Sequence, residues 1–301
     1  MTLKATVFVM LALLAPAQKS GVVEPDPPMV CESCDAWNAP REPFKVFGNV
    51  YFVGTAGLGS VLVTSDAGHI LLDGGLPQSA VVIDAHIRVL GFRTSDIRLI
   101  VNSHAHYDHA GGIHALQRAS GAVVAATAAG ARALQQGMAT ADDPQAGFAA
   151  RYPAVSQVRV FKDGEVLRVG PLALTAHATP GHTPGSTTWT WRSCEGERCL
   201  NMVYADSLTA VSDDVFRFTG DRTHPSIVDS FRRTLAIIEA LPCDILLTPH
   251  PDASRMDAKL ARRAAGDADA FVDPEGCRAY AAAAARRFEQ RVAEEQKQTP
   301  R

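Results

Sequence analysis

The sequence has little concentrated positive charge. It contains no run of more than two basic residues, and its 29 Lys and Arg are balanced by 32 Asp and Glu. Proteins that bind nucleic acid present clustered basic side chains to the phosphates, so we expect no nucleic acid partner. Beyond its first 15 residues the chain also lacks an apolar segment of the roughly 20 residues that a membrane-spanning helix needs. We therefore expect no membrane association of the mature protein.

The N-terminal apolar segment is typical of an export signal. Lys4 is the only early charge, residues 5–15 are apolar almost throughout, and Ala15-Pro16-Ala17 offers small residues for cleavage. This apolar segment is too short to span a bilayer as a helix. We predict a signal peptide over residues 1–17 and a mature protein that is periplasmic or secreted.

The remaining pattern predicts an arm followed by one domain. Residues 18–40 are rich in proline and polar residues, which indicates an extended N-terminal arm. Residues 41–301 form a single domain of two αβ halves, in which short strand-like segments come first and helices close each half. We predict two stacked sheets with helices outside, and a monomer. The predicted helices cover 77–90, 112–118, 227–241, 254–265 and 277–295, and residues 137–153 form an irregular loop.

The six cysteines also favour an oxidising compartment, because their number is even and they form plausible pairs. Cys194 and Cys199 flank a turn between two strand-like segments, so they could join a hairpin. Cys243 precedes an apolar strand and Cys277 opens the last helix, so this pair could attach that helix to the sheet. Each such bridge is typically worth about 2–4 kcal/mol.

Cys31 and Cys34 form a Cys-x-x-Cys motif whose pairing stays open between a disulfide, a redox pair and half of a zinc site. The chain has no second such motif, and we expect no helix after this one. A plain structural bridge or a flexible tail is therefore favoured.

Three histidines and an aspartate lie within the six residues His104-Ala105-His106-Tyr107-Asp108-His109. They follow an apolar run, residues 97–101, that predicts a buried strand. His104 and His106 are two positions apart, so on an extended chain their side chains point the same way. Imidazole and carboxylate are ligands that suit zinc. Four donors exceed what one catalytic zinc needs, so the segment predicts two adjacent metal ions.

Two later histidines complete the expected ligand set. His182 and His250 each follow an apolar strand and are flanked by proline or glycine, which fixes a loop. Three protein ligands for each ion leave positions open for water, as in catalytic zinc sites. We predict two Zn²⁺ ions, one held by His104, His106 and His182 and the other by Asp108, His109 and His250.

Asp73 ends the apolar strand Ile70-Leu71-Leu72. A carboxylate at the end of a buried strand can accept the ring N–H of a ligand histidine and so orient it. We predict this role for Asp73.

These motifs resemble the metallo-β-lactamase superfamily over nearly all of the chain from about Trp37. The resemblance rests on His-x-His-x-Asp-His at 104–109, Pro-Gly-His-Thr-Pro-Gly at 180–185 and Pro-His-Pro at 249–251. It is greatest to class B, subclass 3, whose ligand triads match and whose loop is similar to Ala-Asp-Ser-Leu-Thr at 205–209. The Cys194/Cys199 and Cys243/Cys277 pairs resemble those of exported members. Some relatives pair an N-terminal cysteine with one in the loop where this chain has Ala56, so a third bridge must be different or absent here.

The resemblance implies an αββα sandwich, in which two mixed sheets pack face to face, and hydrolysis of the β-lactam amide in penicillins, cephalosporins and carbapenems. The antibiotic resistance that follows would be its biological effect. A hydroxide bound between two zinc ions would attack the lactam carbonyl, and Asp108 would orient that nucleophile. Ser207 and Thr209 would hydrogen-bond the carboxylate of the small-molecule substrate, and Gln145 on the long loop is a further candidate for contact.

Two other functions stay open. A glyoxalase II-like thioesterase or a lactonase has the same fold, and such enzymes commonly bridge their metals with an aspartate after the third histidine. Asp206 is the candidate for that position. A zinc-storage protein would have the ligand clusters without an open substrate cleft.

Overall fold

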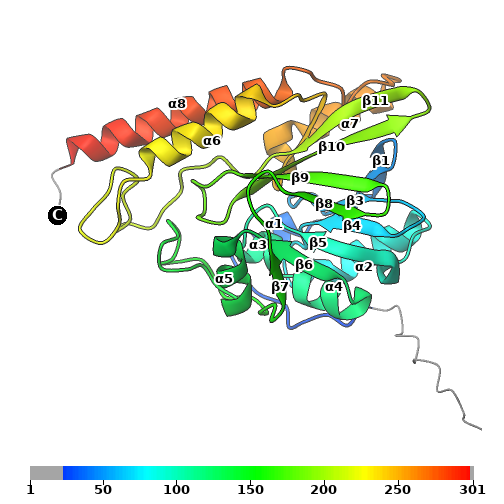
Figure 1. Cartoon of the computed structure of the whole chain (residues 1–301), viewed down its shortest axis with the longest axis horizontal. Helices are drawn as coiled ribbons and strands as arrows, with labels where there is room; N and C mark the ends of the chain where they lie inside the picture. The colour runs from blue at the N-terminus through cyan, green and yellow to red at the C-terminus, as the bar shows by residue number, and fades with distance from the viewer. Residues whose placement is uncertain (1–22, 299–301) are drawn as a thin grey trace, which may run out of the picture.

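The computed structural model of the chain describes residues 23–298, so the expected signal peptide and the first residues of the arm lie outside the described residues. Two sheets pack face to face, and helices cover their outer faces (Figure 1). In chain order, the larger sheet contains β1 (Phe44–Phe47), β2 (Val50–Phe52), β3 (Val61–Val63), β4 (His69–Leu72), β5 (Ile97–Val101), β6 (Val123–Ala126) and β7 (Val158–Val160). The smaller sheet has the order β12 (Ile245–Leu247), β11 (Arg198–Tyr204), β10 (Thr187–Glu195), β9 (Leu172–Ala178) and β8 (Val166–Val169).

Both sheets are mixed, as the resemblance implied. Strands β4 to β7 are parallel and β1 to β4 antiparallel, while in the smaller sheet only β11 and β12 are parallel. The described α-helices are α1 (Cys34–Trp37), α2 (Ser79–Val89), α3 (Tyr107–Ala110), α4 (Ile113–Ser120), α5 (Ala128–Gln136), α6 (Val228–Ala240), α7 (Met256–Ala264) and α8 (Gly276–Lys297). None of these helices combines the length and apolar character needed to cross a membrane.

Apolar clusters hold the layers together. Buried side chains of the strands pack against those of the other sheet or against one face of a helix. Between the sheets, Leu72 of β4 and Trp189 of β10 are fully buried in one cluster. A second cluster joins the larger sheet to α2, α4 and α5. A third joins the smaller sheet to α6 and α8, where the rings of Phe231 and Phe288 lie 4.4 Å apart. The sandwich is thus held from three sides, which fixes the strand ends that carry the site.

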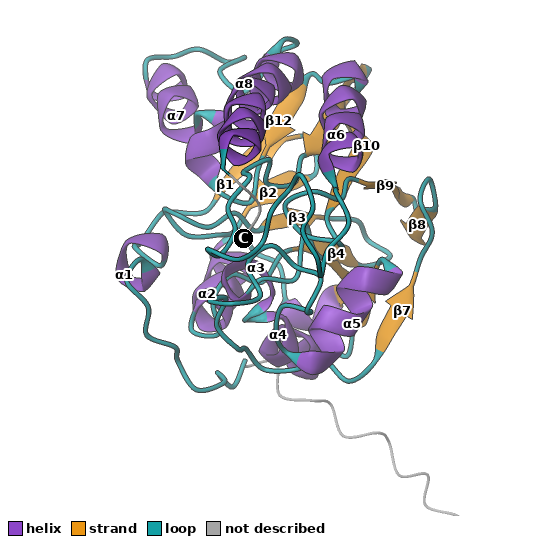
Figure 2. Cartoon of the chain, turned by 90° about the vertical axis from the view of Figure 1, so that its left-hand side faces the viewer, coloured by secondary structure: helices purple, strands orange, loops and turns teal. Residues whose placement is uncertain are grey.

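The strands direct their connecting loops to one edge of the sandwich. β4 and β5 are parallel, so Asp73 and Asn102 follow them at the same end. The smaller sheet meets this end directly, because the Trp189 indole donates to the Asn102 carbonyl at 2.9 Å and the Thr187 amide donates to the Ser103 carbonyl at 2.7 Å. Figure 2, which views the chain from the left of Figure 1, shows the loops gathered between the two helical layers.

All six cysteines are paired in disulfides, consistent with their even number. Cys194–Cys199 closes the hairpin of β10 and β11, and Cys243–Cys277 joins the segment before β12 to α8. Cys31 and Cys34 bond to each other within the arm. The expectation that no helix follows this motif was wrong, since α1 begins at Cys34, although it has only 4 residues.

Loss of the Cys243–Cys277 bridge is expected to reduce stability more than loss of Cys194–Cys199. The two bridges span sequence separations of 34 and 5 residues. Loop-closure entropy then gives contributions of about 4 and about 2 kcal/mol to the free energy of unfolding. Urea unfolding of the C243A/C277A and C194A/C199A variants, in oxidising buffer, measures both. Equal losses would contradict the entropic argument.

Candidate metal centre

The six-residue segment 104–109 leaves the sheet edge and turns into a short helix. β5 ends at Val101, and α3 begins at Tyr107. His106 precedes α3 in an extended conformation, with φ −83° and ψ 159°, and Asp108 lies in the first turn of that helix. The change from extended chain to helix turns donors from both sides of the bend toward one point.

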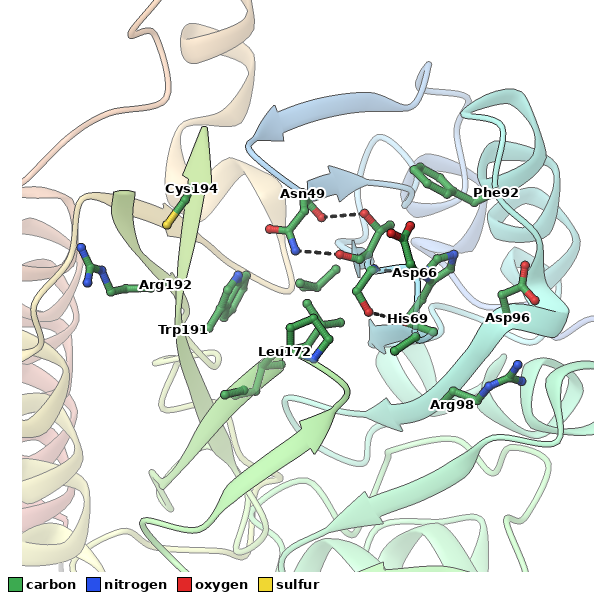
Figure 3. Close-up of a pocket in the computed structure, with 18 of the residues that line it drawn as sticks. Asn49, Asp66, His69, Phe92, Asp96, Arg98, Leu172, Trp191, Arg192 and Cys194 are labelled. Atoms are coloured by element: carbon green, nitrogen blue, oxygen red, sulfur yellow. Dashed lines mark hydrogen bonds between the residues drawn. The ribbon is translucent and has the colours of Figure 1, made fainter. Parts of the chain in front are cut away.

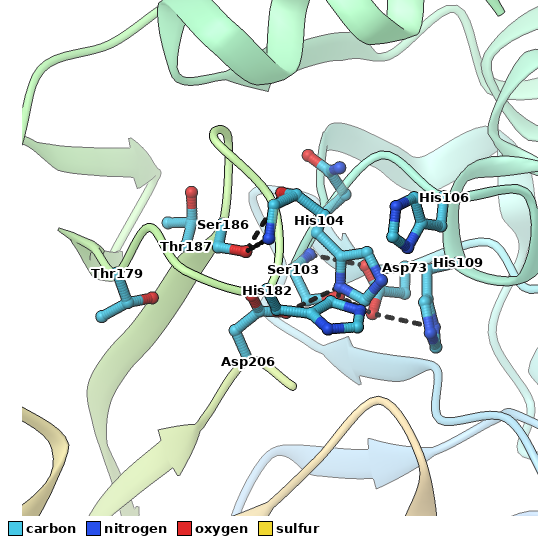
Figure 4. Close-up of polar contacts among 12 residues, drawn as sticks. Asp73, Ser103, His104, His106, His109, Thr179, His182, Ser186, Thr187 and Asp206 are labelled. Carbon is cyan, nitrogen blue, oxygen red and sulfur yellow. Dashed lines mark hydrogen bonds and ion pairs between the residues drawn. The ribbon is translucent and has the colours of Figure 1, made fainter. Parts of the chain in front are cut away.

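Two groups of possible metal ligands form at this edge, and Figure 4 shows four of the histidine rings facing one another. The ligand atoms of His104, His106 and His182 all lie within 4.8 Å of one another, as do those of His104, Asp108 and His109. Because both groups contain His104, they are adjacent. His182 comes from the loop after β9, so the cluster joins the two sheets.

His250 lies beside the second group rather than within it. Its Nε2 is 3.4 Å from Asp108 Oδ2, and its ring centroid is 4.8 Å from that of His109. Its Nδ1 contacts the Gly57 carbonyl at 3.2 Å. The side chain of His250 is 30% exposed, whereas that of His109 is fully buried, so the cluster reaches solvent at His250. The structure therefore brings all six predicted ligands together.

Hydrogen bonds outside the cluster orient two of the rings. His104 Nδ1 lies 2.7 Å from Asp206 Oδ1, and His182 Nδ1 lies 2.9 Å from the Thr209 carbonyl. Each bond engages Nδ1 as the donor and leaves Nε2 with a free lone pair for a metal. The contact with Asp206 was not predicted as a hydrogen bond, because Asp206 was considered only as a bridging ligand.

Burial keeps two of the histidine rings neutral. It lowers the pKa of His104 well below its usual value and that of His182 to about 3, so both rings are neutral. Burial would raise the pKa of Asp108, but His109 and His250 outweigh it, and the pKa lies well below its usual range. Neutral imidazoles and an ionised carboxylate are the forms that bind metal ions.

His109 provides the clearest evidence that these residues fit a metal. Its side chain is fully buried, yet among the described residues neither ring nitrogen makes a hydrogen bond of good geometry, although Nε2 lies 3.2 Å from Asp108 Oδ2. An unpaired polar group inside a protein is costly and calls for a specific explanation. A bound zinc ion would satisfy the ring, and neutral imidazoles with one carboxylate are a donor set that zinc accepts.

Asp73 lies directly beneath the cluster and holds the chain that leads into it. Its carboxylate accepts hydrogen bonds from the Ser103 amide at 2.7 Å, the Ser103 hydroxyl at 2.8 Å and the Tyr204 hydroxyl at 2.6 Å. Asp73 Oδ2 is 3.9 Å from His109 Nδ1, which exceeds hydrogen-bonding distance. The backbone of Asp73 has φ +61°, a strained conformation for a residue with a side chain. The predicted bond to a ligand ring stays a prediction, and the observed contacts fix Ser103 instead.

Glycine is required immediately after the ligand segment. A Cβ atom on Gly112 would collide with the carbonyl oxygen of Gly74, and one on Gly111 would collide with Pro77. These close approaches let the chain after α3 pass against the turn that follows Asp73.

The residues expected to contact a substrate surround the same cluster. Ser207 is buried in the loop after β11. The Thr209 hydroxyl is 3.0 Å from His182 Nδ1, so it contacts a ligand ring in the structure. Gln145, on the loop before β7, is buried with its amide nitrogen 3.4 Å from His182 Nε2. The substrate contacts of these residues stay predictions.

Sequence reasoning missed Asp143, which contacts the cluster from the same loop as Gln145. Its carboxylate oxygens lie 3.1 and 3.2 Å from His106 Nε2. Burial alone would lower the pKa of His106, but the contact with Asp143 outweighs it, and the pKa is raised. No motif marks Asp143, because its partner is 37 residues away in sequence.

A large cavity of about 990 Å³ lies apart from the histidine cluster. Residues where β4, β5 and β9 begin line it, including His69, Arg98 and Leu172 (Figure 3). The histidine cluster lies instead where β4 and β5 end. The cavity and the metal ligands therefore occupy opposite edges of the sandwich, and the cavity is not the site of the metal chemistry.

Known proteins with the same fold and similar sequences identify the family. The sequence model of the metallo-β-lactamase superfamily matches residues 59–195 of this chain. The solved structure of Rm3 metallo-β-lactamase is 51% identical, with a TM-score of 0.86 over 89% of this chain and 100% of that one. MEM-A1, a subclass B3 metallo-β-lactamase isolated from a soil metagenome library, is 46% identical, with a TM-score of 0.85 over 87% of this chain and 100% of that one.

A third structure, SMB-1 in complex with mercaptoacetic acid, is 46% identical, with a TM-score of 0.82 over 86% of this chain and 99% of that one. The chain belongs to the metallo-β-lactamase superfamily. Within it, the chain falls in the group that includes the subclass B3 enzyme MEM-A1, as the ligand pattern predicted.

A hydroxyacylglutathione hydrolase from Anaeromyxobacter dehalogenans (strain 2CP-C) is 37% identical over 121 residues. That match covers 40% of this chain and only 37% of the relative. This partial match is consistent with a shared fold. The structural matches, which cover most of the chain, are the stronger evidence for the family.

Proposed function

We propose that this protein is a zinc-dependent β-lactamase that hydrolyses the amide bond of penicillins, cephalosporins and carbapenems. The observation that carries the proposal is the convergence of five histidines and Asp108 at one edge of the sandwich. They lie in a chain that is about half identical to Rm3 metallo-β-lactamase. The similar enzyme SMB-1 was solved in complex with mercaptoacetic acid, so a relative of this chain binds a small carboxylic acid.

The ligand assignment is part of this proposal. His104, His106 and His182 would hold one zinc ion, and Asp108, His109 and His250 would hold the other. When bound, zinc supplies a Lewis acid that polarises the lactam carbonyl and makes water nucleophilic at neutral pH. The chain orients these groups, since Asp206 and the Thr209 carbonyl fix the rings of His104 and His182.

The remaining residues position the substrate and the attacking water. Asp108 is ionised and buried among histidines, so its second oxygen can accept a hydrogen bond from water and hold it in place. Ser207 and Thr209 lie on the loop beside His182 and would donate hydrogen bonds to the substrate carboxylate. The His250 side of the cluster is exposed, which provides a path for substrate.

A thioesterase acting on glutathione thioesters is the second candidate, because of the partial similarity to a hydroxyacylglutathione hydrolase. In that reading Asp206 bridges two metals. The 2.7 Å contact of Asp206 with His104 Nδ1 favours the lactamase instead, because it engages the carboxylate in orienting a ligand ring.

The substrate class is tested with the zinc-loaded protein and three compounds: nitrocefin, a carbapenem and a glutathione thioester. We expect rapid opening of both β-lactams and no turnover of the thioester. Turnover of the thioester with intact β-lactams would establish the second candidate. Tight zinc binding without either activity would point to zinc storage.

The export prediction belongs to the same proposal. Three disulfides form within the described residues, and disulfides persist outside the reducing cytosol. We propose that the mature protein is a monomer in the periplasm or is secreted, where it meets β-lactams before they reach their targets.

A further inference from the structure

Asp143 is the one buried acid of the long loop between α5 and β7 that contacts a predicted metal ligand within the described residues. Its carboxylate is 4% exposed, and its two oxygens lie 3.1 and 3.2 Å from His106 Nε2. The neighbouring Asp142 is exposed and forms an ion pair with Arg132 at 3.6 Å. A buried carboxylate needs a donor partner to offset its desolvation, and His106 is that partner.

The contact determines which nitrogen of His106 faces the cluster. His104 and His182 have their Nδ1 atoms engaged outside the cluster, so the lone pair of each ring is on Nε2. His106 has the opposite arrangement, because its Nε2–H donates to Asp143. As a metal ligand the imidazole is neutral and carries one proton, so with that proton on Nε2 the lone pair of His106 is on Nδ1. Without Asp143 the proton and the ring orientation would be unspecified.

The same residue connects the ring to the loop above it. Asp143 Oδ1 also accepts a hydrogen bond from the backbone N–H of Gln145 at 2.8 Å, which fixes the backbone at the turn. Further along, Asp213 from the other half of the protein accepts the Gly147 amide at 3.0 Å and donates its own amide to the Pro144 carbonyl at 2.8 Å. Residues 143–147 are thus held at one end by a metal ligand and at the other by the loop after β11.

We propose that Asp143 is a positioning residue that fixes His106 as an Nδ1 ligand and attaches the 143–147 loop segment to the metal centre. The proposal deepens the proposed function, since it rests on the assignment of His106 as a zinc ligand. In this proposal the 143–147 loop segment belongs to the metal site, because its first residue holds a metal ligand. Gln145 is carried by the same turn, so Asp143 also sets its position beside His182.

The decisive experiment compares Zn²⁺ binding to the metal-free forms of three variants, Asp143→Ala, Asp143→Asn and Asp142→Asn, by competition with a chromophoric chelator. We expect Asp143→Ala to lower the affinity for one of the two Zn²⁺ ions by about 10- to 100-fold. Loss of other residues that hydrogen-bond a ligand histidine has effects of this size. Asp143→Asn should lose less, because its amide oxygen still accepts the ring N–H without the charge. Asp142→Asn, the matched exposed neighbour, should bind both ions like the unaltered protein.

A second readout separates positioning from simple destabilisation. With Co²⁺ in place of Zn²⁺, the visible absorption of the Asp143→Ala protein should shift, whereas that of Asp142→Asn should not. Unchanged Zn²⁺ affinity and an unchanged Co²⁺ spectrum in Asp143→Ala would overturn the proposal. Should Asp143→Ala fail to fold, Asp143→Asn decides, and Zn²⁺ affinity equal to that of Asp142→Asn would overturn it. These measurements use no β-lactam, so failure of the proposed activity would be seen separately.

Discussion

Replacing His182 with alanine is expected to lower the turnover of β-lactams by more than about a hundredfold while the fold is retained, because catalysis depends on the zinc that this ring helps to hold. His182 is one of three donors in the all-histidine group, and the substitution leaves two. The ring lies in a loop after β9 and belongs to none of the apolar clusters, so its loss removes little packing. Steady-state kinetics and circular dichroism of the purified variant measure the two effects.

A matched control is available on the strand before it. His177 of β9 is half-buried, and its Nε2 contacts the Thr190 hydroxyl at 2.8 Å, away from the cluster. His177→Ala should retain activity within about twofold, as do most substitutions away from a site. Complete unfolding of His182→Ala would show that the metal is structural, and full activity would show that His182 is no ligand.

Removal of metal is expected to abolish hydrolysis, and Zn²⁺ but not Mg²⁺ is expected to restore it. Five of the six predicted donors are imidazoles, which suit Zn²⁺, whereas Mg²⁺ demands oxygen ligands. The protein should also melt at a lower temperature without metal, since the ligands converge only in the folded chain. At a free Zn²⁺ concentration of 100 times Kd, the stabilisation is about 2.7 kcal/mol for one site.

The measurement is an activity assay and a thermal melt after dialysis against a chelator, with residual zinc determined by atomic absorption. The control is the same protein dialysed without chelator. Hydrolysis that persists in protein shown to contain no metal would refute zinc-dependent catalysis. Restoration by Mg²⁺ alone would mean that the imidazoles are not the ligands.

The elements that patterning predicted well are those with strong local signals. The strand predicted over residues 97–101 coincides with β5, because a buried apolar run bounded by polar residues has few alternative conformations. The last helix, predicted over 277–295, is α8 at Gly276–Lys297. Its Phe288 and Val292 are four apart and both buried, which is the spacing of one helix face.

Other elements were missed for identifiable reasons. α5, Ala128–Gln136, was not predicted, because it contains Gly130 and only one large apolar side chain, so no apolar face is visible in its sequence. What defines it is capping: the Thr127 hydroxyl accepts the Gly130 amide, and Gly137 ends it in a left-handed conformation. The hairpin of β10 and β11 continues through polar residues up to the Cys194–Cys199 pair, where no apolar pattern marks the strands.

The same division holds for the site. His104, His106, Asp108 and His109 could be predicted as a group because they are adjacent in sequence, and His182 and His250 because they follow strands. Asp143 and the role of Asp206 could not, since the first contacts His106 across 37 residues and the second contacts His104 across 102. Such contacts depend on how loops fold over the sheet edge, and no periodicity records them.

The positions of the metal ions themselves offer the sharpest test. Crystals of the zinc-loaded protein, measured at the zinc absorption edge, should contain two anomalous peaks. One should be surrounded by His104, His106 and His182, and the other by Asp108, His109 and His250. A single peak, or a peak bound by Asp206 in place of one of these ligands, would contradict the proposed dizinc site.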